Sequence, residues 1–204
     1  MHPASIRTAI ACVATLATCG AMPQEIGQST SWLDSAAPST WNTPGQAIPT
    51  APKIESAVDP RCRELARPQQ LTEDARVRER GWDLVGAFQG GWDIVVTGAA
   101  AGYDGMCRPL QYQHFVFVRG VFAGTLSPEP MNSRSDGALG QVWLQNQTQL
   151  TAEYSRYRET DALCCPSART AVVFEIEGSP PTVRPVSVST SRPPSATESP
   201  RSDN

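Results

Sequence analysis

The strongest constraint on the fold is a stretch of two-residue alternation, QHFVFVRGVFAGTL, at residues 113–126. Successive side chains of a strand point to opposite faces, so the two phenylalanines of FVFV face one way and the two valines the other. The Arg119-Gly120 pair that follows is typical of a two-residue hairpin turn of the primed type. The pattern therefore predicts an antiparallel β-hairpin in this part of the chain.

Further strands are expected on both sides of this hairpin. Alternation predicts a second hairpin over 82–96, with its turn at Gly90-Gly91, and two strands at 141–145 and 148–157. A last strand is expected at 170–176, where TAVVFEI is apolar on one face. Together with helices at the start of the unit, these segments predict an α+β to mainly β fold, with an antiparallel sheet of about six strands.

One or two helices are expected before the strands. An Asp-Pro pair at 59–60 is typical of a helix start, because aspartate caps the first turn and proline tolerates its first position. A second helix is predicted over 69–80, with Leu71 and Ala75 on its apolar side. Gly81 follows where a left-handed residue commonly ends a helix.

Composition divides the 204 residues into a folded unit and two flanks. Proline, serine, threonine and alanine dominate residues 19–58 and 178–204, and such segments bury too little apolar surface to offset the entropy of ordering. We expect both flanks to be disordered, the first as a tether and the second as a spacer or an O-glycosylated stalk. The remaining 59–177 suffices for one domain with a single hydrophobic core.

Charge argues against nucleic acid as a partner. The formal net charge is −3, and acidic and basic residues are interspersed along the chain. A nucleic-acid-binding surface normally shows a basic patch or stripe, which the sequence does not display.

Residues 1–18 are expected to form a lipoprotein signal peptide. One arginine precedes an apolar run at 9–17, which is within the 7–15 residues of a signal peptide and short of the roughly 20 that span a membrane. Leu16-Ala17-Thr18-Cys19 is similar to a lipobox, although Thr18 differs from the glycine, alanine or serine usual at that position. Cys12 is a poorer candidate, because few apolar residues precede it. We therefore expect lipidation at Cys19.

A lipid on Cys19 would make the bilayer the first partner of the protein. Two or more acyl chains hold a protein stably on a membrane, whereas one chain holds it marginally. The expected location is the outer face of the cell membrane. The alternative is cleavage after a small residue such as Ala21, which would release a secreted protein.

Four cysteines remain in the folded unit, and an even number in an exported domain predicts two disulfides. They are Cys62, Cys107, Cys164 and Cys165. A bond between the adjacent pair closes a strained ring, so we expect Cys62 and Cys107 each to pair with one of the adjacent cysteines. Which pairs with which stays open.

Three phrases of the sequence point to a known family: GYDGMCRPLQYQHFVFV, GVFAGTLSPEPMNSRSDGALG and LTAEYSRYRETDALCCPSARTAVVFEI. In combination they resemble the LppP/LprE lipoproteins of mycobacteria and related actinobacteria, over about residues 82–176. The resemblance implies an envelope lipoprotein with one folded domain. It brings no catalytic residue, ligand or cofactor to this chain.

Catalytic and metal-binding patterns are not recognisable. His114 is the one histidine outside the signal peptide, and no G-x-S-x-G elbow accompanies it, as a serine hydrolase would need. The acidic residues lack the D-x-D-x-D-G spacing of a calcium loop. We therefore predict no catalytic residues, no metal and no cofactor.

The segment 127–140 is the best candidate for a binding surface, because it is long for a hairpin connection and long ordered loops often carry function. Arg134 and Asp136 are the expected polar contacts, with Met131 as an apolar anchor. The alternative is a solvated loop without a ligand.

These observations favour a membrane-anchored envelope lipoprotein whose domain is a non-enzymatic binding or accessory module. Its expected contact is an envelope protein, lipid or glycan. The alternative is an anchored or secreted enzyme of unrecognised type that acts on envelope lipid or glycan. A concave pocket with convergent polar groups near His114 or Arg134 would favour the enzyme.

Overall fold

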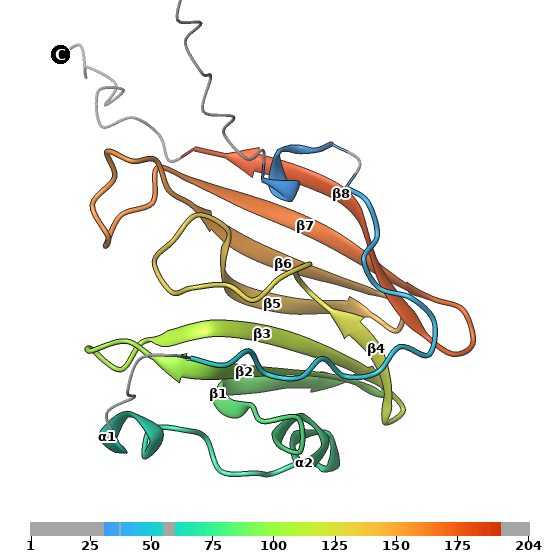
Figure 1. Cartoon of the computed structure of the whole chain (residues 1–204). Helices are drawn as coiled ribbons and strands as arrows, with labels where there is room; N and C mark the ends of the chain where they lie inside the picture. Colours follow the sequence, from blue (N-terminus) through green and yellow to red (C-terminus); the bar gives the residue numbers. More distant parts are fainter. Residues whose placement is uncertain (1–30, 37, 55–59, 193–204) are drawn as a thin grey trace, which may run out of the picture.

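Eight strands form two four-stranded antiparallel sheets in the computed structural model, which describes residues 31–36, 38–54 and 60–192 (Figure 1). The first sheet contains, in order, β1 (Asp83–Gly91), β2 (Ile94–Tyr103), β3 (Pro109–Val118) and β4 (Val121–Thr125). The second contains β5 (Ala138–Asn146), β6 (Gln149–Arg156), β7 (Ala168–Glu177) and β8 (Thr182–Ser191). The mainly β class is confirmed, but the expectation of one sheet of about six strands is wrong.

The two sheets pack face to face over a shared apolar core, with β1 beside β5 and β4 beside β8. Val116 of β3 and Phe174 of β7 are both fully buried in this core. Because each sheet contributes one apolar face, neither can bury that face without the other.

A second core covers the outer face of the first sheet. Figure 1 shows α1 (Pro60–Arg63) and α2 (Thr72–Arg78) on the side of this sheet away from β5–β8. Phe115 and Phe117 point into this layer, where they are fully buried with Val77 of α2. Phe115 also meets the Trp82 ring edge-on, with 5.2 Å between the ring centroids. The predicted alternation of β3 is therefore confirmed, and both faces of the strand are covered.

The N-terminal segment belongs to the folded unit. It begins with a short 3-10 helix, η1 (Trp32–Asp34), in which Leu33 is 1% exposed. The Trp32 ring meets Tyr154 edge-on, and the Trp41 indole N–H donates to the carbonyl oxygen of Thr125 at 3.2 Å. The expected disorder of the first flank is therefore wrong for the described residues up to 54, because two tryptophans and a leucine are packed against the core. Residues 19–30 lie outside the described part.

The second flank contributes an entire strand. β8 pairs with β7 along its length, from Thr182 opposite Glu177 to Ser191 opposite Arg169, and Val183 is fully buried. The expected disordered tail is therefore wrong as far as residue 191. The folded unit extends beyond 59–177 on both sides, and residues 193–204 lie outside the described part.

Both helices are shorter than expected, and α2 buries a different face. Its buried residues are Asp74 and Val77, whereas Leu71 and Ala75 are half-buried. The Asp74 carboxylate accepts two hydrogen bonds from the Arg67 guanidinium, at 2.7 and 2.8 Å. Asp74 is thus buried because its carboxylate is paired, whereas a pattern of apolar residues predicts apolar side chains at the buried positions of a helix.

One of the two predicted hairpin turns is confirmed, and the other is displaced. Arg119 and Gly120 have φ angles of 49° and 74°, so the primed turn between β3 and β4 is confirmed. The turn between β1 and β2 consists of Trp92 and Asp93, with φ angles of 51° and 64°. The expected turn at Gly90-Gly91 is wrong, because both glycines belong to β1.

The cysteines pair differently from the expectation. Cys62 of α1 is bonded to Cys107 in the turn between β2 and β3, with 4.9 Å between the Cα atoms. Cys164 is bonded to its neighbour Cys165. The predicted cross-pairing is wrong because α1 packs beside the first sheet, whereas the adjacent pair lies in the connection between β6 and β7 of the second.

Candidate functional site

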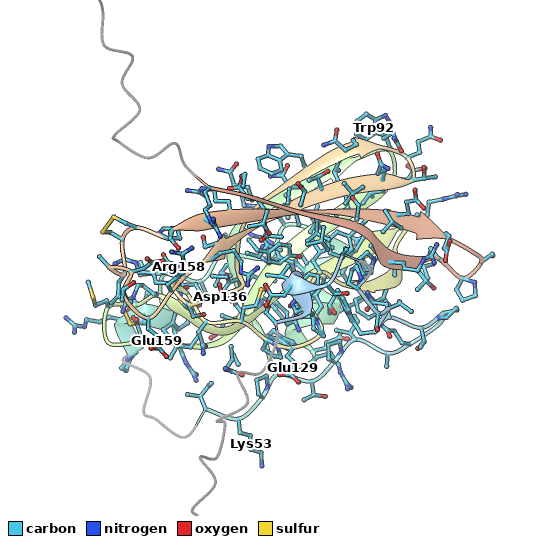
Figure 2. All side chains as sticks on the ribbon, turned by 90° about the horizontal axis from the view of Figure 1, so that it is seen from above. Lys53, Trp92, Glu129, Asp136, Arg158 and Glu159 are labelled. Carbon is cyan, nitrogen blue, oxygen red and sulfur yellow. A yellow bond between two sulfur atoms is a disulfide. The ribbon has the colours of Figure 1, made fainter. Side chains whose placement is uncertain are left out.

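A cavity of about 400 Å³ lies where η1 crosses the end of the second sheet, beside the last residues of β6 and β8. Its lining combines charged and hydroxyl-bearing side chains with a few apolar ones: Leu33, Asp34, Ser35, Ala36, Asp136, Arg156, Tyr157, Arg158, Ser167, Ala168, Val188, Thr190 and Arg192. Figure 2 shows Asp136 and Arg158 in the same region of the molecule. The cavity therefore brings the expected contact Asp136 together with residues from four other segments.

Arg156 organises this cavity. Its Nη2 donates to Oδ1 of Asp34 at 2.7 Å, and its Nε donates to Oδ1 of Asp136 at 2.8 Å. Burial alone would lower the pKa of the guanidinium, but the bonds to Asp136 and Asp34 raise the pKa above its ordinary value. Arg156 thus joins β6 to η1 and to the 127–140 segment as a permanent cation. We call Arg156, Asp34 and Asp136 the Arg156 cluster.

The predicted binding loop contributes only part of what was expected of it. Asp136 lines the cavity, whereas Arg134 is exposed and stands outside the cavity lining. Met131 is wrong as a surface anchor, because it is 9% exposed and belongs to the core between the sheets. Its backbone exchanges two 2.8 Å hydrogen bonds with Tyr112, which places it beside β3.

His114 lies apart from this cavity. It belongs to β3 opposite Gly98, and a Cβ atom at Gly98 would lie 3.1 Å from its Nε2, so the absence of a side chain there leaves room for the imidazole. Its buried Nδ1 has no hydrogen-bond partner among the described residues, and burial lowers its pKa to about 4. His114 is therefore neutral at physiological pH, and no carboxylate of the described residues orients it as in a Ser-His-Asp triad.

The described residues contain neither a candidate metal site nor a candidate membrane-spanning helix. No group of three or more histidine, cysteine, aspartate and glutamate side chains there could hold a metal ion. Nor does that part of the chain contain a helix of the length and apolarity needed to cross a membrane. Neither finding extends to residues 1–30, which include the expected lipidation site Cys19.

A second hollow, of about 480 Å³, lies at the other end of β5 and was not predicted. Its lining is uncharged: Gln89, Gly90, Gly91, Trp92, Trp143 and Leu144. Trp92 is 52% exposed and Trp143 is 42% exposed, an unusual exposure for two indole rings in one hollow. We call these six residues the tryptophan platform.

The sequence offered only weak signals for either site. Arg156 stands at the end of a predicted strand without a motif around it, and its partner Asp34 lies 122 positions away. Trp92 was assigned to a strand, and only its position after two glycines indicated a turn nearby.

Comparison with known proteins gives one similarity. Neither the curated proteins nor the solved structures contain a match to this chain. A family model matches the part from the turn before β2 to the turn after β7, and this part does not include the N-terminal segment, the two helices, β1 or β8. Over residues 92–179, the chain matches the family model described as LppP/LprE lipoprotein.

Proposed function

We propose that this protein is a cell-envelope lipoprotein, anchored to the outer face of the cell membrane through a lipid on Cys19, and that its sandwich is a non-enzymatic binding module. The match of residues 92–179 to a lipoprotein family supports the lipoprotein class. The apolar run and the lipobox-like Leu16-Ala17-Thr18-Cys19 support the anchoring residue.

The Arg156 cluster is the observation that carries this proposal. It attaches the N-terminal segment to one end of the sandwich through two charge-assisted hydrogen bonds. Twelve positions separate Cys19 from Ser31, the first described residue, and a chain of that length reaches roughly 40 Å at full extension. A lipid at Cys19 would therefore hold the Arg156 end of the domain within about 40 Å of the membrane, and the opposite end of the domain lies farther from this attachment.

Detergent partitioning of the native protein tests the anchor. The wild-type chain, expressed in its host, is expected to enter the detergent phase of Triton X-114, and Cys19→Ala is expected to move it to the aqueous phase. Cys12→Ala is the matched control, because it removes another cysteine of the same segment and should leave the partitioning unchanged. An aqueous wild-type chain, or a Cys19→Ala chain that still enters the detergent phase, would contradict the anchor.

The non-enzymatic role is supported by the state of His114, a neutral imidazole with an unpartnered Nδ1. We expect His114→Gln to retain the envelope role of the protein when it replaces the wild-type gene. The measurement is complementation of a deletion strain, with protein amount and membrane fraction determined in parallel. Loss of the role at normal amount and location would indicate that the imidazole acts on a substrate.

A further inference from the structure

The tryptophan platform combines two exposed indoles with a floor that has almost no side chains. Gly90 and Gly91 pair with Val95 and Ile94 in β2, so the floor is a rigid piece of sheet. The side of Gly91 that would carry a Cβ faces Leu144 of the second sheet at 3.6 Å. The hollow therefore lies across the edges of both sheets.

Trp92 occupies a backbone position that its side chain does not favour. Both central residues of a type I′ turn need positive φ, and asparagine and glycine are the residues that adopt it most readily. Trp92 adopts a φ of 51° there, although half of its side chain is exposed to solvent. Burial of the Trp92 side chain is too small to offset the strain of a left-handed backbone at a bulky residue, which points to a role other than folding.

Trp143 faces outward from the edge strand β5, opposite Thr151 of β6. The hydroxyl of Thr151 accepts a 3.5 Å hydrogen bond from the side-chain amide of Gln145, the next outward-facing residue of β5. Gln89, which has a side-chain amide, also lines the hollow. The Trp143 indole is thus flanked by amide and hydroxyl groups.

We propose that the tryptophan platform binds a neutral glycan chain, an inference that rests on the proposed function and names the ligand class of the binding module. A sugar ring has an apolar C–H face, which an indole covers, and a rim of hydroxyls, which amides can bind. None of the six platform residues is charged, so the platform offers no ion pair to an acidic or basic ligand.

The geometry disfavours an added peptide strand. Such a ligand would pair by backbone hydrogen bonds with the edge of β1 or with the edge of β5, and the register of β5 shifts between Leu144 and Asn146, at the platform. The register of β1 shifts between Val85 and Gln89, and Gly86 has a φ of 65°, so the edge is irregular directly before the platform. Bulges of this kind protect edge strands from pairing with another chain.

The position of the platform disfavours the bilayer as its ligand. β5 begins two residues after Asp136 of the Arg156 cluster and reaches Trp143 about 17 Å further along the strand. Figure 2 shows Trp92 well apart from Asp136 and Arg158. The platform therefore lies at the end of the domain farther from the point where the N-terminal segment is attached.

Binding of defined hexasaccharides by the full chain tests the proposal. Calorimetry would use cellohexaose, maltohexaose and mannohexaose, with a hyaluronan hexasaccharide as the charged comparison, in a detergent without a sugar headgroup. We expect at least one neutral hexasaccharide to bind and the charged one not to bind better. Trp92→Asn and Trp143→Ala should each weaken that binding about tenfold. Leu163→Ala, at a residue that is 58% exposed elsewhere, should leave it unchanged.

Several results would overturn the proposal. In calorimetry, these are the absence of binding to every neutral hexasaccharide, or binding by the tryptophan variants that equals that of the wild-type chain. In sedimentation, it is a dimer that both variants abolish. With phosphatidylglycerol vesicles, it is binding that depends on the two tryptophans. Trp92→Asn suits the turn, and urea denaturation of that variant shows whether a loss of binding is accompanied by a loss of stability. The binding assay does not depend on a lipid at Cys19. A failure of the proposed lipid anchor and a failure of the proposed glycan binding are therefore distinguishable.

Discussion

The side-chain amide of Asn42 fills the space directly above Gly124, where a Cβ atom would collide with it. Asn42 is 3% exposed, and its Nδ2 donates to the carbonyl oxygens of Thr125 and Val183, each at 2.9 Å. Its Oδ1 accepts from the backbone N–H of Thr125 at 3.0 Å. One amide therefore joins the N-terminal segment to β4 of the first sheet and β8 of the second.

Gly124→Ala is expected to destabilise the fold by about 3 kcal/mol. The new methyl group displaces Asn42 and leaves buried backbone groups of Thr125 and Val183 without partners. The φ of 135° at Gly124 adds backbone strain. Urea denaturation measures the loss, and Gly105→Ala, which meets open space, is the matched control. In an Asn42→Ala background the same substitution should have a smaller effect. Equal effects in both backgrounds would contradict the assigned contact.

Loss of the Cys62–Cys107 disulfide is expected to lower the free energy of unfolding by up to about 4 kcal/mol. The bond closes a loop with a sequence separation of 45, and the chain-entropy relation gives that magnitude. The double variant Cys62→Ala, Cys107→Ala tests it by thermal unfolding. Cys164→Ala with Cys165→Ala is the matched control, because a bond between neighbours constrains almost no chain. A larger loss in the control would show that the connection between β6 and β7 matters more than α1.

Stability is expected to fall as the pH decreases from about 6.5 to about 4, because of His114. Burial lowers its pKa from 6.5 to about 4, so the unfolded chain binds the proton first in this window. The contribution of the neutral imidazole is complete above pH 6.5 and decreases by up to about 3 kcal/mol at pH 4. Urea denaturation across this range should show the slope in wild type and a weaker slope in His114→Gln. Parallel curves for the two proteins would show that His114 is solvated in the folded state.

Trp92→Asn is expected to raise the free energy of unfolding by about 0.5–1 kcal/mol, because asparagine adopts positive φ more readily. Trp92 would thus lower the free energy of unfolding of the wild-type protein and provide a ligand contact that asparagine cannot. Urea denaturation of the variant, beside Trp143→Ala at an ordinary strand position, measures the difference. A loss of more than about 1 kcal/mol in Trp92→Asn would mean that the indole serves the fold.

The elements predicted from the sequence are those that local patterns determine. β3 was placed correctly on both faces, because Phe115 and Val116 alternate within one strand and Arg119-Gly120 sets the turn. The elements that were missed depend on distant partners. Asn42 is bound to residues 83 and 141 positions away, and nothing in its local sequence indicates that it is buried.

The same reason explains the missed strand and the missed sites. β8 carries exposed serines at 187, 189 and 191 on one face, so its composition resembles that of a disordered tail although Val183 is fully buried. The cysteine pairing depends on where α1 docks, which no spacing specifies. The two indoles of the platform come from different sheets, so only the packing of those sheets brings them to one hollow.

Intact-mass spectrometry of the protein purified from its host tests the central claim most directly. The account predicts a mature chain that begins at Cys19 and carries the mass of a diacylglyceryl group, with this species missing from Cys19→Ala. A mature chain with unmodified Cys19, or one that begins at another residue without lipid, would contradict it.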